Sequence, residues 1–396
     1  MSFGVSTTVP GGERRIARGS LVGSATVLGL LLTGAVVALV SESDRFALRP
    51  PTSAELQAFA ARLEASFAQG STELLRSRML GEPIAIWALR GRDSTPEQVL
   101  SAARVFEGGL GGYVARLEEQ IGPHGRWTVT RTVSEPEATL WIRLSGRSLG
   151  YLELHLAKDQ LGRVVVVDLI SHMSGTSFGD SIRRERSKAL AAAAHQLSGF
   201  LDQGRDRDAL AFARGLPEPL AREPELLGMR ARAAASVGGE ELNAALRALE
   251  EALPEGDPRR VVLLSHYWRQ GQTQQALALL EAVGRRVDQD KALEALRAQV
   301  LLDGARAARP AQAAPLLEDA RQRAARAAES LPRDPYVQRV ALAVALQRGA
   351  FADAMGPLER LVREGVPLAD LKGIPGFDEL TRSAPFQRFS EERGGE

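Results

Sequence analysis

The sequence of 396 residues contains no cysteine. This absence excludes disulfide bonds, thiolate metal sites, cysteine nucleophiles and lipid attachment through cysteine. Histidine is also scarce, and its five copies show neither the three- or four-residue spacing nor the neighbouring carboxylates of a helical metal site. The sequence therefore predicts no metal site, and nothing in it indicates another cofactor.

Lysine and asparagine are almost missing. Asn243 is the single asparagine, and lysine occurs only as Lys158, Lys188, Lys291 and Lys372. Arginine is used instead, and alanine, glycine and proline are abundant, which is typical of GC-rich bacterial coding sequences. The 50 basic and 49 acidic residues leave a net charge of +1, which gives no reason to expect a nucleic-acid partner. The length allows two or three domains, each with its own core.

One segment differs from this ordinary composition. Residues 20–41, SLVGSATVLGLLLTGAVVALVS, contain no charged side chain, and a helix of that length spans about 30 Å, the thickness of the hydrocarbon layer. Arginines precede the segment and acidic residues follow it, which predicts a cytoplasmic N-terminus. We expect a cytoplasmic tail (1–19), a transmembrane helix (20–41) and a linker (42–53). A cleaved signal peptide is the alternative, although its apolar region is normally only about 7–15 residues long.

From residue 54 the hydrophobic period is that of amphipathic helices. Three helical stretches are predicted: one ending at Gly70, one around 71–80, and one that follows Thr95 as its N-cap. The pattern then alternates as in β-strands. The positions predicted to share a face within each strand are Trp127, Val129 and Arg131; Leu140, Ile142 and Leu144; and Leu152, Leu154 and Leu156, followed by a more fully buried strand over 164–170. Tyr151, Glu153 and His155 lie opposite the leucines, which predicts a solvated face.

This order of helices and strands, closed by the run GRVVVVDLISHMSGTSFGDSIRRE (162–185), resembles the nuclear-transport-factor-two-like family. The resemblance implies that residues 54–185 form an α+β cone-like domain, in which a curved sheet wraps around helices. In some members of the family a pocket inside the cone performs acid–base chemistry. Asp168, His155 and His172 would be the corresponding groups here if they converge on a pocket.

A second catalytic pattern, Gly-x-Ser-x-Gly at 175–179, matches a nucleophile elbow. That motif needs further parallel strands carrying an acidic residue and a histidine, and the chain beyond residue 185 is helical. A glycine-rich turn is therefore the better interpretation, and the sequence predicts no enzyme, with the middle domain left open.

Beyond residue 187 the helical pattern is interrupted by glycine at regular intervals. The glycines are Gly204, Gly239, Gly271, Gly304 and Gly349, separated by 35, 32, 33 and 45 residues. Five residues after a glycine stands an alanine in four of the copies, namely Ala209, Ala244, Ala276 and Ala354, whereas the fourth copy has Arg309. Glycine permits the left-handed backbone of a tight turn, and alanine lets two helices approach closely. Each copy is therefore predicted to be a helical hairpin.

This period and spacing resemble the tetratricopeptide repeat. The resemblance implies an α-solenoid over 187–389, because a single hairpin cannot bury its apolar face alone. A terminal helix would close the solenoid with a buried set of Phe377, Leu380, Phe386 and Phe389. The fourth copy departs most from the pattern, and we expect an insertion or a longer second helix there.

The resemblance also implies a concave protein-binding face built from the first helix of each hairpin. The partner-binding residues it selects here are Met229, Trp268, Arg269, Lys291, Glu294, Tyr336 and Arg339. Trp268 and Tyr336 would anchor a peptide, and Arg339 would meet a carboxylate. Packing of Trp268 between neighbouring repeats is the alternative.

We therefore predict a mainly α protein with one transmembrane helix, an α+β cone-like domain and an α-solenoid. Its predicted function is that of a membrane-anchored protein–protein adaptor or scaffold in envelope assembly or secretion. The bulk of the chain would lie on the periplasmic side of the bacterial inner membrane. One alternative is a small-molecule-binding or acid–base role of the middle domain. Another is a structural component whose solenoid packs on its own middle domain and leaves no free groove.

Overall fold

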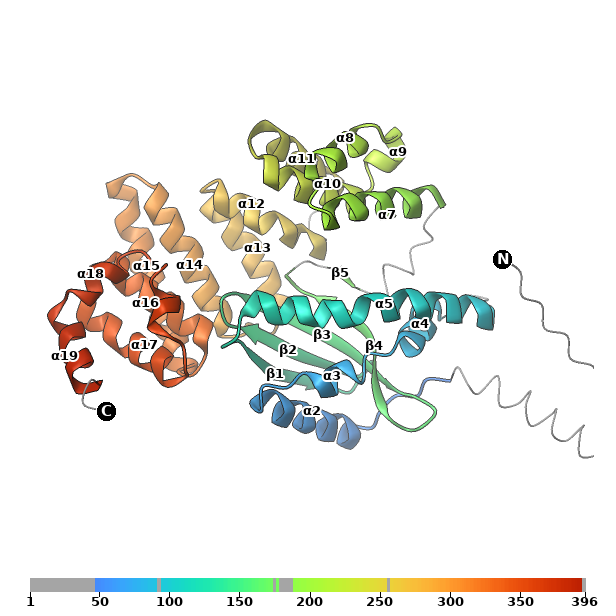
Figure 1. Cartoon of the computed structure of the whole chain (residues 1–396), viewed down its shortest axis with the longest axis horizontal. Helices are drawn as coiled ribbons and strands as arrows, with labels where there is room; N and C mark the ends of the chain where they lie inside the picture. The colour runs from blue at the N-terminus through green and yellow to red at the C-terminus, as the bar shows by residue number, and fades with distance from the viewer. Residues whose placement is uncertain (1–46, 91–93, 174–175, 178–187, 255–256, 394–396) are drawn as a thin grey trace, which may run out of the picture. The chain divides into compact units, whose positions relative to one another are not determined.

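The computed structural model describes residues 47–90, 94–173, 176–177, 188–254 and 257–393. These residues are mostly helical, with one small antiparallel sheet (Figure 1). The predicted tail, the predicted transmembrane helix (20–41) and the first part of the predicted linker lie outside the described residues.

Among the described residues, no helix is both long enough and apolar enough to cross a bilayer. The two longest, α5 (Pro96–Ile121) and α15 (Pro310–Ser330), carry charged side chains. The predicted fold class is therefore corrected to helices and a small antiparallel sheet, with no membrane-spanning helix among the described residues. The predicted single-pass topology, periplasmic placement and inner-membrane location are withdrawn with it. They depended on the apolarity of one segment and on the charges that flank it.

The helices before the sheet begin at side-chain caps. α2 (Ser53–Ala68) follows Thr52, whose side chain and that of Glu55 form a reciprocal capping box. α5 follows Thr95, as predicted, and Gln98 completes a second capping box. Both boxes satisfy backbone N–H groups that would otherwise lack partners in the first helical turn.

Between these two helices the sequence pattern is less informative. The predicted stretch at 71–80 contains only the one-turn helix α3 (Glu73–Arg76). The sequence analysis does not predict α4 (Gly81–Leu89), because this helix is largely buried and has no clear polar face. At Gly81 a Cβ atom would lie 2.4 Å from the Ala103 carbonyl oxygen of α5, so the two helices meet where only glycine fits.

Five antiparallel strands follow in the order β1-β2-β3-β4-β5. The bounds of the strands are β1 Arg126–Val133, β2 Thr139–Ser145, β3 Leu149–Lys158, β4 Val164–Ser171 and β5 Thr176–Ser177. The predicted leucine and isoleucine positions of β2 and β3 are all buried, at 3% exposure or less. We call the side of the sheet that carries them the inner face, and the opposite side the outer face.

The prediction that Trp127, Val129 and Arg131 share a face is wrong. The β1–β2 register shifts between Val129 and Arg131, so Thr130 is the extra residue of a β-bulge. Trp127 and Val129 pair with inner-face residues of β2, whereas Arg131 pairs with Trp141 on the outer face. An inserted residue inverts the alternation, and hydrophobicity alone does not reveal it.

Beyond the sheet the chain forms five helical hairpins, whose succession follows the colour change from green to red in Figure 1. Their two arms are α7 (Lys188–Asp202) and α8 (Asp206–Arg214); α10 (Pro224–Val237) and α11 (Gly239–Ala252); η1 (Pro258–Leu263) with α12 (Leu264–Arg269) and α13 (Thr273–Arg286); α14 (Ala292–Ala307) and α15; and α16 (Pro335–Gln347) and α17 (Phe351–Arg363). A short helix, α9 (Glu218–Ala221), connects the first two. We call these five hairpins the array.

Three of the predicted turns have the expected geometry. Gly204, Gly271 and Gly349 adopt φ values of 69°, 67° and 66°, in the left-handed region that glycine tolerates best. The alanine five residues after each of them is fully buried. In the second hairpin Gly238 and Gly239 both have positive φ. There Ala245 is fully buried and the predicted Ala244 only partly so.

Gly304 is not a turn residue, which corrects the prediction for the fourth hairpin. It lies inside α14 and is buried, and the turn comes later, at Ala308 and Arg309. Pro310 then starts α15, because proline needs no hydrogen-bond partner in the first turn of a helix. At 21 residues α15 is the longer second helix expected there.

The C-terminal segment packs on the last hairpin. After η2 (Leu368–Leu371), α18 (Phe377–Thr381) buries Phe377 and Leu380 against α16 and α17. Phe386 and Phe389 of α19 (Ala384–Arg393) are partly buried against the same cluster. The predicted closing helix is thus divided into two short helices.

Two helical glycines provide a matched test of this packing. A Cβ atom at Gly304 would lie 2.4 Å from Thr273 Oγ1, whereas one at Gly228 in α10 would meet nothing within 4 Å. Gly304→Ala is expected to lower the free energy of unfolding by about 1 kcal/mol or more, since overpacking costs about 1–3 kcal/mol. Gly228→Ala is expected to raise it by up to about 1 kcal/mol through helix propensity. Urea unfolding measures both, and equal effects would contradict the contact.

Candidate functional site

The outer face of the sheet is where the array docks, and it is not solvated as predicted. It carries Trp141, Arg143 and Ser145 of β2 and Tyr151, Glu153 and His155 of β3. Arg143, Ser145 and Tyr151 are 7% exposed or less. Tyr151 belongs to an apolar core that continues through the array as far as Val344 in α16. Polar side chains on this face therefore meet helices instead of water.

Arg143 makes the central polar contact of this interface. Its Nη1 donates to both carboxylate oxygens of Asp290, at 2.9 Å each. Its Nε lies 3.2 Å from Asp334 Oδ2 in an ion pair. The Tyr151 hydroxyl also donates to Asp290, and Ser145 Oγ donates to Asp334. One strand residue thus holds two carboxylates that lie in different hairpins.

Both carboxylates also begin helices of the array. Asp290 Oδ1 accepts the backbone N–H of Ala292 at the start of α14. Asp334 is the N-cap of α16 and accepts the N–H of Val337 at 3.1 Å. Carboxylates at helix N-termini are favoured by the free N–H groups and by the helix dipole. The first helices of two successive hairpins are therefore attached to the same arginine.

The titration of this cluster follows from burial and charge. Burial disfavours the charged guanidinium, but Asp290 and Asp334 outweigh it and raise the pKa of Arg143. Burial, together with the neighbouring Asp290 carboxylate, raises the pKa of Tyr151 well above 10.0. At neutral pH Arg143 is therefore charged, and Tyr151 is neutral and able to donate a hydrogen bond.

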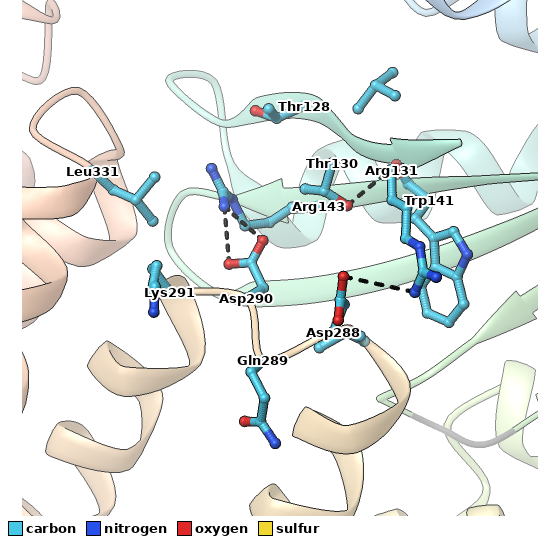
Figure 2. Close-up of a pocket in the computed structure, with 12 residues that line it drawn as sticks. Thr128, Thr130, Arg131, Trp141, Arg143, Asp288, Gln289, Asp290, Lys291 and Leu331 are labelled. Atoms are coloured by element: carbon cyan, nitrogen blue, oxygen red, sulfur yellow. Dashed lines mark hydrogen bonds and ion pairs between the residues drawn. The ribbon is translucent and has the colours of Figure 1, made fainter. Parts of the chain in front are cut away.

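Beside this cluster an open cleft of about 390 Å³ lies between the sheet and the array (Figure 2). One wall consists of Thr128, Val129, Thr130 and Arg131 of β1 with Trp141 and Arg143 of β2, and the other of residues 287–291 with Leu331. Figure 2 shows Arg143 paired with Asp290 and Arg131 directed toward Asp288 across the opening. The cleft thus combines polar, aromatic and aliphatic groups from both parts of the chain.

Two of the three predicted acid–base residues, His155 and His172, meet at Glu153, which the sequence analysis did not single out for this role, and the third, Asp168, pairs with His155 in the sheet. Glu153 Oε2 lies 3.0 Å from His172 Nε2, and Glu153 Oε1 lies 3.3 Å from His155 Nε2. His155 is paired with Asp168 in the β3–β4 register, and its Nδ1 lies 3.1 Å from Glu137 Oε2. The His172 ring is stacked on Trp141 with 4.5 Å between centroids. Trp141 lines the cleft, but His155, His172 and Asp168 do not.

In this group, burial and the attraction between Glu153 and the histidines shift the pKa values in opposite directions. Burial would raise the pKa of Glu153, but the hydrogen bonds and charge of His155 and His172 lower it to about 2. Burial would likewise lower the pKa of His155, but Glu153, followed by Asp168 and Glu137, raises it above 6.5. The arrangement therefore favours an ionised carboxylate next to a protonated imidazole. No group of three or more His, Cys, Asp or Glu side chains among the described residues is placed to hold a metal ion.

The aromatic residues predicted to contact a partner are used inside the array. Trp268 is partly buried in the apolar core, and its Nε1 donates to Asp303 of the next hairpin at 3.0 Å. Tyr336 is 7% exposed, and burial raises its pKa. Trp268 thus lies between neighbouring repeats, which is the alternative raised for it above.

The other predicted contact residues are divided between internal and exposed positions. Glu294 accepts from Arg297 and Arg323, and Arg339 Nη1 donates to the Asp370 carbonyl oxygen. Met229 is partly buried against the core. Arg269 and Lys291 are exposed, and Lys291 lines the cleft. The seven residues therefore do not form a single groove.

Sequence reasoning missed Arg143, Asp290 and Asp334. Two signals were present: Asp334-Pro335 before a helical stretch is a typical N-cap and first-turn pair, and Asp290 stands shortly before another helix. Arg143 lies between Ile142 and Leu144 in a strand, where alternation assigns it to solvent. Nothing in the local pattern connects residues separated by 147 and 191 positions.

No protein-family model matches the chain, and no curated protein matches it at a significant level of similarity. The resemblances to tetratricopeptide repeats and to the nuclear-transport-factor-two-like family therefore stay predictions.

Arg143→Met is expected to lower the free energy of unfolding by about 3–5 kcal/mol, because it leaves two buried carboxylates without their counter-charge. Arg131→Met is the matched control, since its ion pair with Asp288 is long, at 3.8 Å, and exposed, and should cost less than about 1 kcal/mol. Adding Asp290→Asn and Asp334→Asn to Arg143→Met should recover much of the loss, because asparagine still caps helices. Chemical denaturation checks all three, and a small effect of Arg143→Met would contradict the buried cluster.

The Glu153–His155 pair predicts the pH dependence of stability. The raised pKa of His155 means that its contribution is complete below about 6.5 and is lost as pH rises through the folded-state value. The lowered pKa of Glu153 means that its contribution is complete above 4.5 and is lost as pH falls toward 2. We expect His155→Gln to flatten the alkaline side of the stability profile measured by urea unfolding. His195→Gln, at an exposed position on α7, should leave the profile unchanged.

Proposed function

We propose that the chain is a protein–protein adaptor whose array is of the tetratricopeptide kind and presents the binding surface. The observation that carries this proposal is the succession of five antiparallel hairpins, whose apolar core runs from the sheet through the first four hairpins to α16 of the fifth. Arrays of this construction expose long surfaces made of repeated helices and take up partner segments along them. We further propose that residues 54–185 are a cone-like domain that supports the array.

The binding surface would lie on the first three hairpins, because the first helices of the last two are enclosed. α14 and α16 bury residues on all sides, and α16 is covered by the C-terminal helices. On α10 and α12, by contrast, Arg232, Ser236, Ser265 and Arg269 are exposed. Arginine is one of the residue types that most often carries binding energy at protein interfaces. Arg269 is therefore the proposed centre of contact, in place of the partly buried Trp268 and the buried Tyr336.

A photoreactive amino acid at position 269 tests this proposal in cells. The matched control is position 321, an exposed arginine on the second helix α15. We expect one defined protein to crosslink from position 269 and not from position 321. With that protein purified, Arg269→Glu should weaken binding about tenfold or more, which corresponds to about 1.4 kcal/mol. Only intramolecular products from position 269 would contradict an adaptor and favour the structural alternative.

The acid–base role of the middle domain is a second candidate. The contacts of His155 and His172 with Glu153, with Asp168 paired to His155 in the sheet, support it, because an ionised carboxylate beside a protonated imidazole is a proton donor–acceptor pair. It predicts a small molecule whose binding is abolished by Asp168→Ala and by His155→Ala but is unaffected by Arg269→Glu. That difference separates the two candidates.

A further inference from the structure

The cleft between the sheet and residues 287–291 has backbone features that packing alone does not require. On one wall, the β-bulge at Thr130 brings Arg131 to the outer face. On the other wall, Asp288 and Gln289 are consecutive non-glycine residues with φ values of 55° and 53°. A single left-handed residue suffices to end a helix such as α13. Unfavourable backbone conformations and bulges are concentrated at binding sites, where they direct side chains toward a ligand.

The charges around the cleft are unequally compensated. Arg143 is neutralised by Asp290 and Asp334. Among the described residues Arg131 pairs only with the distant Asp288, at 3.8 Å, and the Asp288 side chain is 75% exposed. Lys291 is exposed and forms no ion pair within the described part of the chain. Two cations, one from the sheet and one from the array, are thus available in the same cleft.

The uncharged residues that line the cleft indicate what kind of molecule could carry the bound anionic group. Val287 and Leu331 are aliphatic, Trp141 is aromatic, and Thr128 and Thr130 carry hydroxyl groups. Sites for small molecules use a few polar groups to orient the ligand and have volumes of about 300–1,000 Å³. The observed volume of about 390 Å³ falls in this range.

We propose that this cleft is a binding site for a small organic carboxylate with an aromatic or aliphatic body. The carboxylate pairs with Arg131, and the body lies against Trp141 and the aliphatic residues, while Lys291 at the other end of the cleft adds positive charge. Asp288 competes with the ligand for Arg131. Because Arg131 and Trp141 belong to the sheet and Val287 to the array, the bound ligand strengthens their attachment. The site lies apart from the proposed adaptor surface around Arg269, so the two proposals stand or fall separately.

Titration of the purified full-length chain with benzoate tests the site, with isothermal calorimetry as the readout and benzylamine as the probe of similar body and opposite charge. We expect saturable binding of benzoate and none of benzylamine. Lys291→Ala should weaken benzoate binding about two- to threefold through the lost positive charge, and Lys291→Arg should restore it. Lys372→Ala removes another exposed lysine and should have no effect.

Asp288→Asn gives the sharpest prediction. Asparagine tolerates the left-handed conformation of residue 288 well, so the loop is retained while the competing charge is removed. We expect benzoate to bind about two- to fivefold more tightly, the range that an exposed ion pair supports. A purely structural role for Asp288 gives no such gain. The proposal is overturned if benzoate does not saturate, if benzylamine binds equally, or if neither Lys291→Ala nor Asp288→Asn changes the affinity.

Discussion

The contact of Arg143 with Asp290 and Asp334 is the interaction on which the arrangement of sheet and array depends. All three side chains are less than 10% exposed, and isolated charges at such burial are strongly unfavourable. Each is compensated only when strand β2 and the starts of α14 and α16 are in place together. The two carboxylates also cap their helices, so the same atoms serve helix initiation and domain docking. Loss of one partner therefore affects local and long-range structure at once.

This constraint decides which surfaces are available for binding. Neighbouring helices enclose α14 and α16, where Tyr336 is buried and Glu294 is paired with arginines. Trp268 is likewise used between hairpins. The exposed positions that stay available lie on α10 and α12, and in the cleft that the docking itself creates. A ligand that binds in a cleft formed by two parts of the chain stabilises the contact between those parts. The reason is that binding to a folded state stabilises that state.

Much of the local structure could be predicted from short patterns. Thr95 and Pro96 begin α5, the alternating leucines form β2 and β3, and Gly204, Gly271 and Gly349 make left-handed turns. These predictions succeed because capping, alternation and the conformational freedom of glycine act over a few residues. The same patterns fail where the local spacing changes. At the bulge of Thr130 alternation assigns Arg131 to the wrong face, and after Gly238 and Gly239 the spacing selects Ala244 instead of the buried Ala245.

The sequence by itself determined most of the helices, the strands and the repetition of hairpins, since each depends on neighbours within one or two turns. Only the tertiary structure decided that the outer face of the sheet is covered by the array and not by solvent. Arg143, Tyr151 and Glu153 have the alternation of solvated residues, yet two are buried under the array and the third joins two histidines. The physical reason is distance along the chain. Burial of a polar group becomes favourable only when its partner arrives, and the partners of Arg143 come from hairpins folded far downstream.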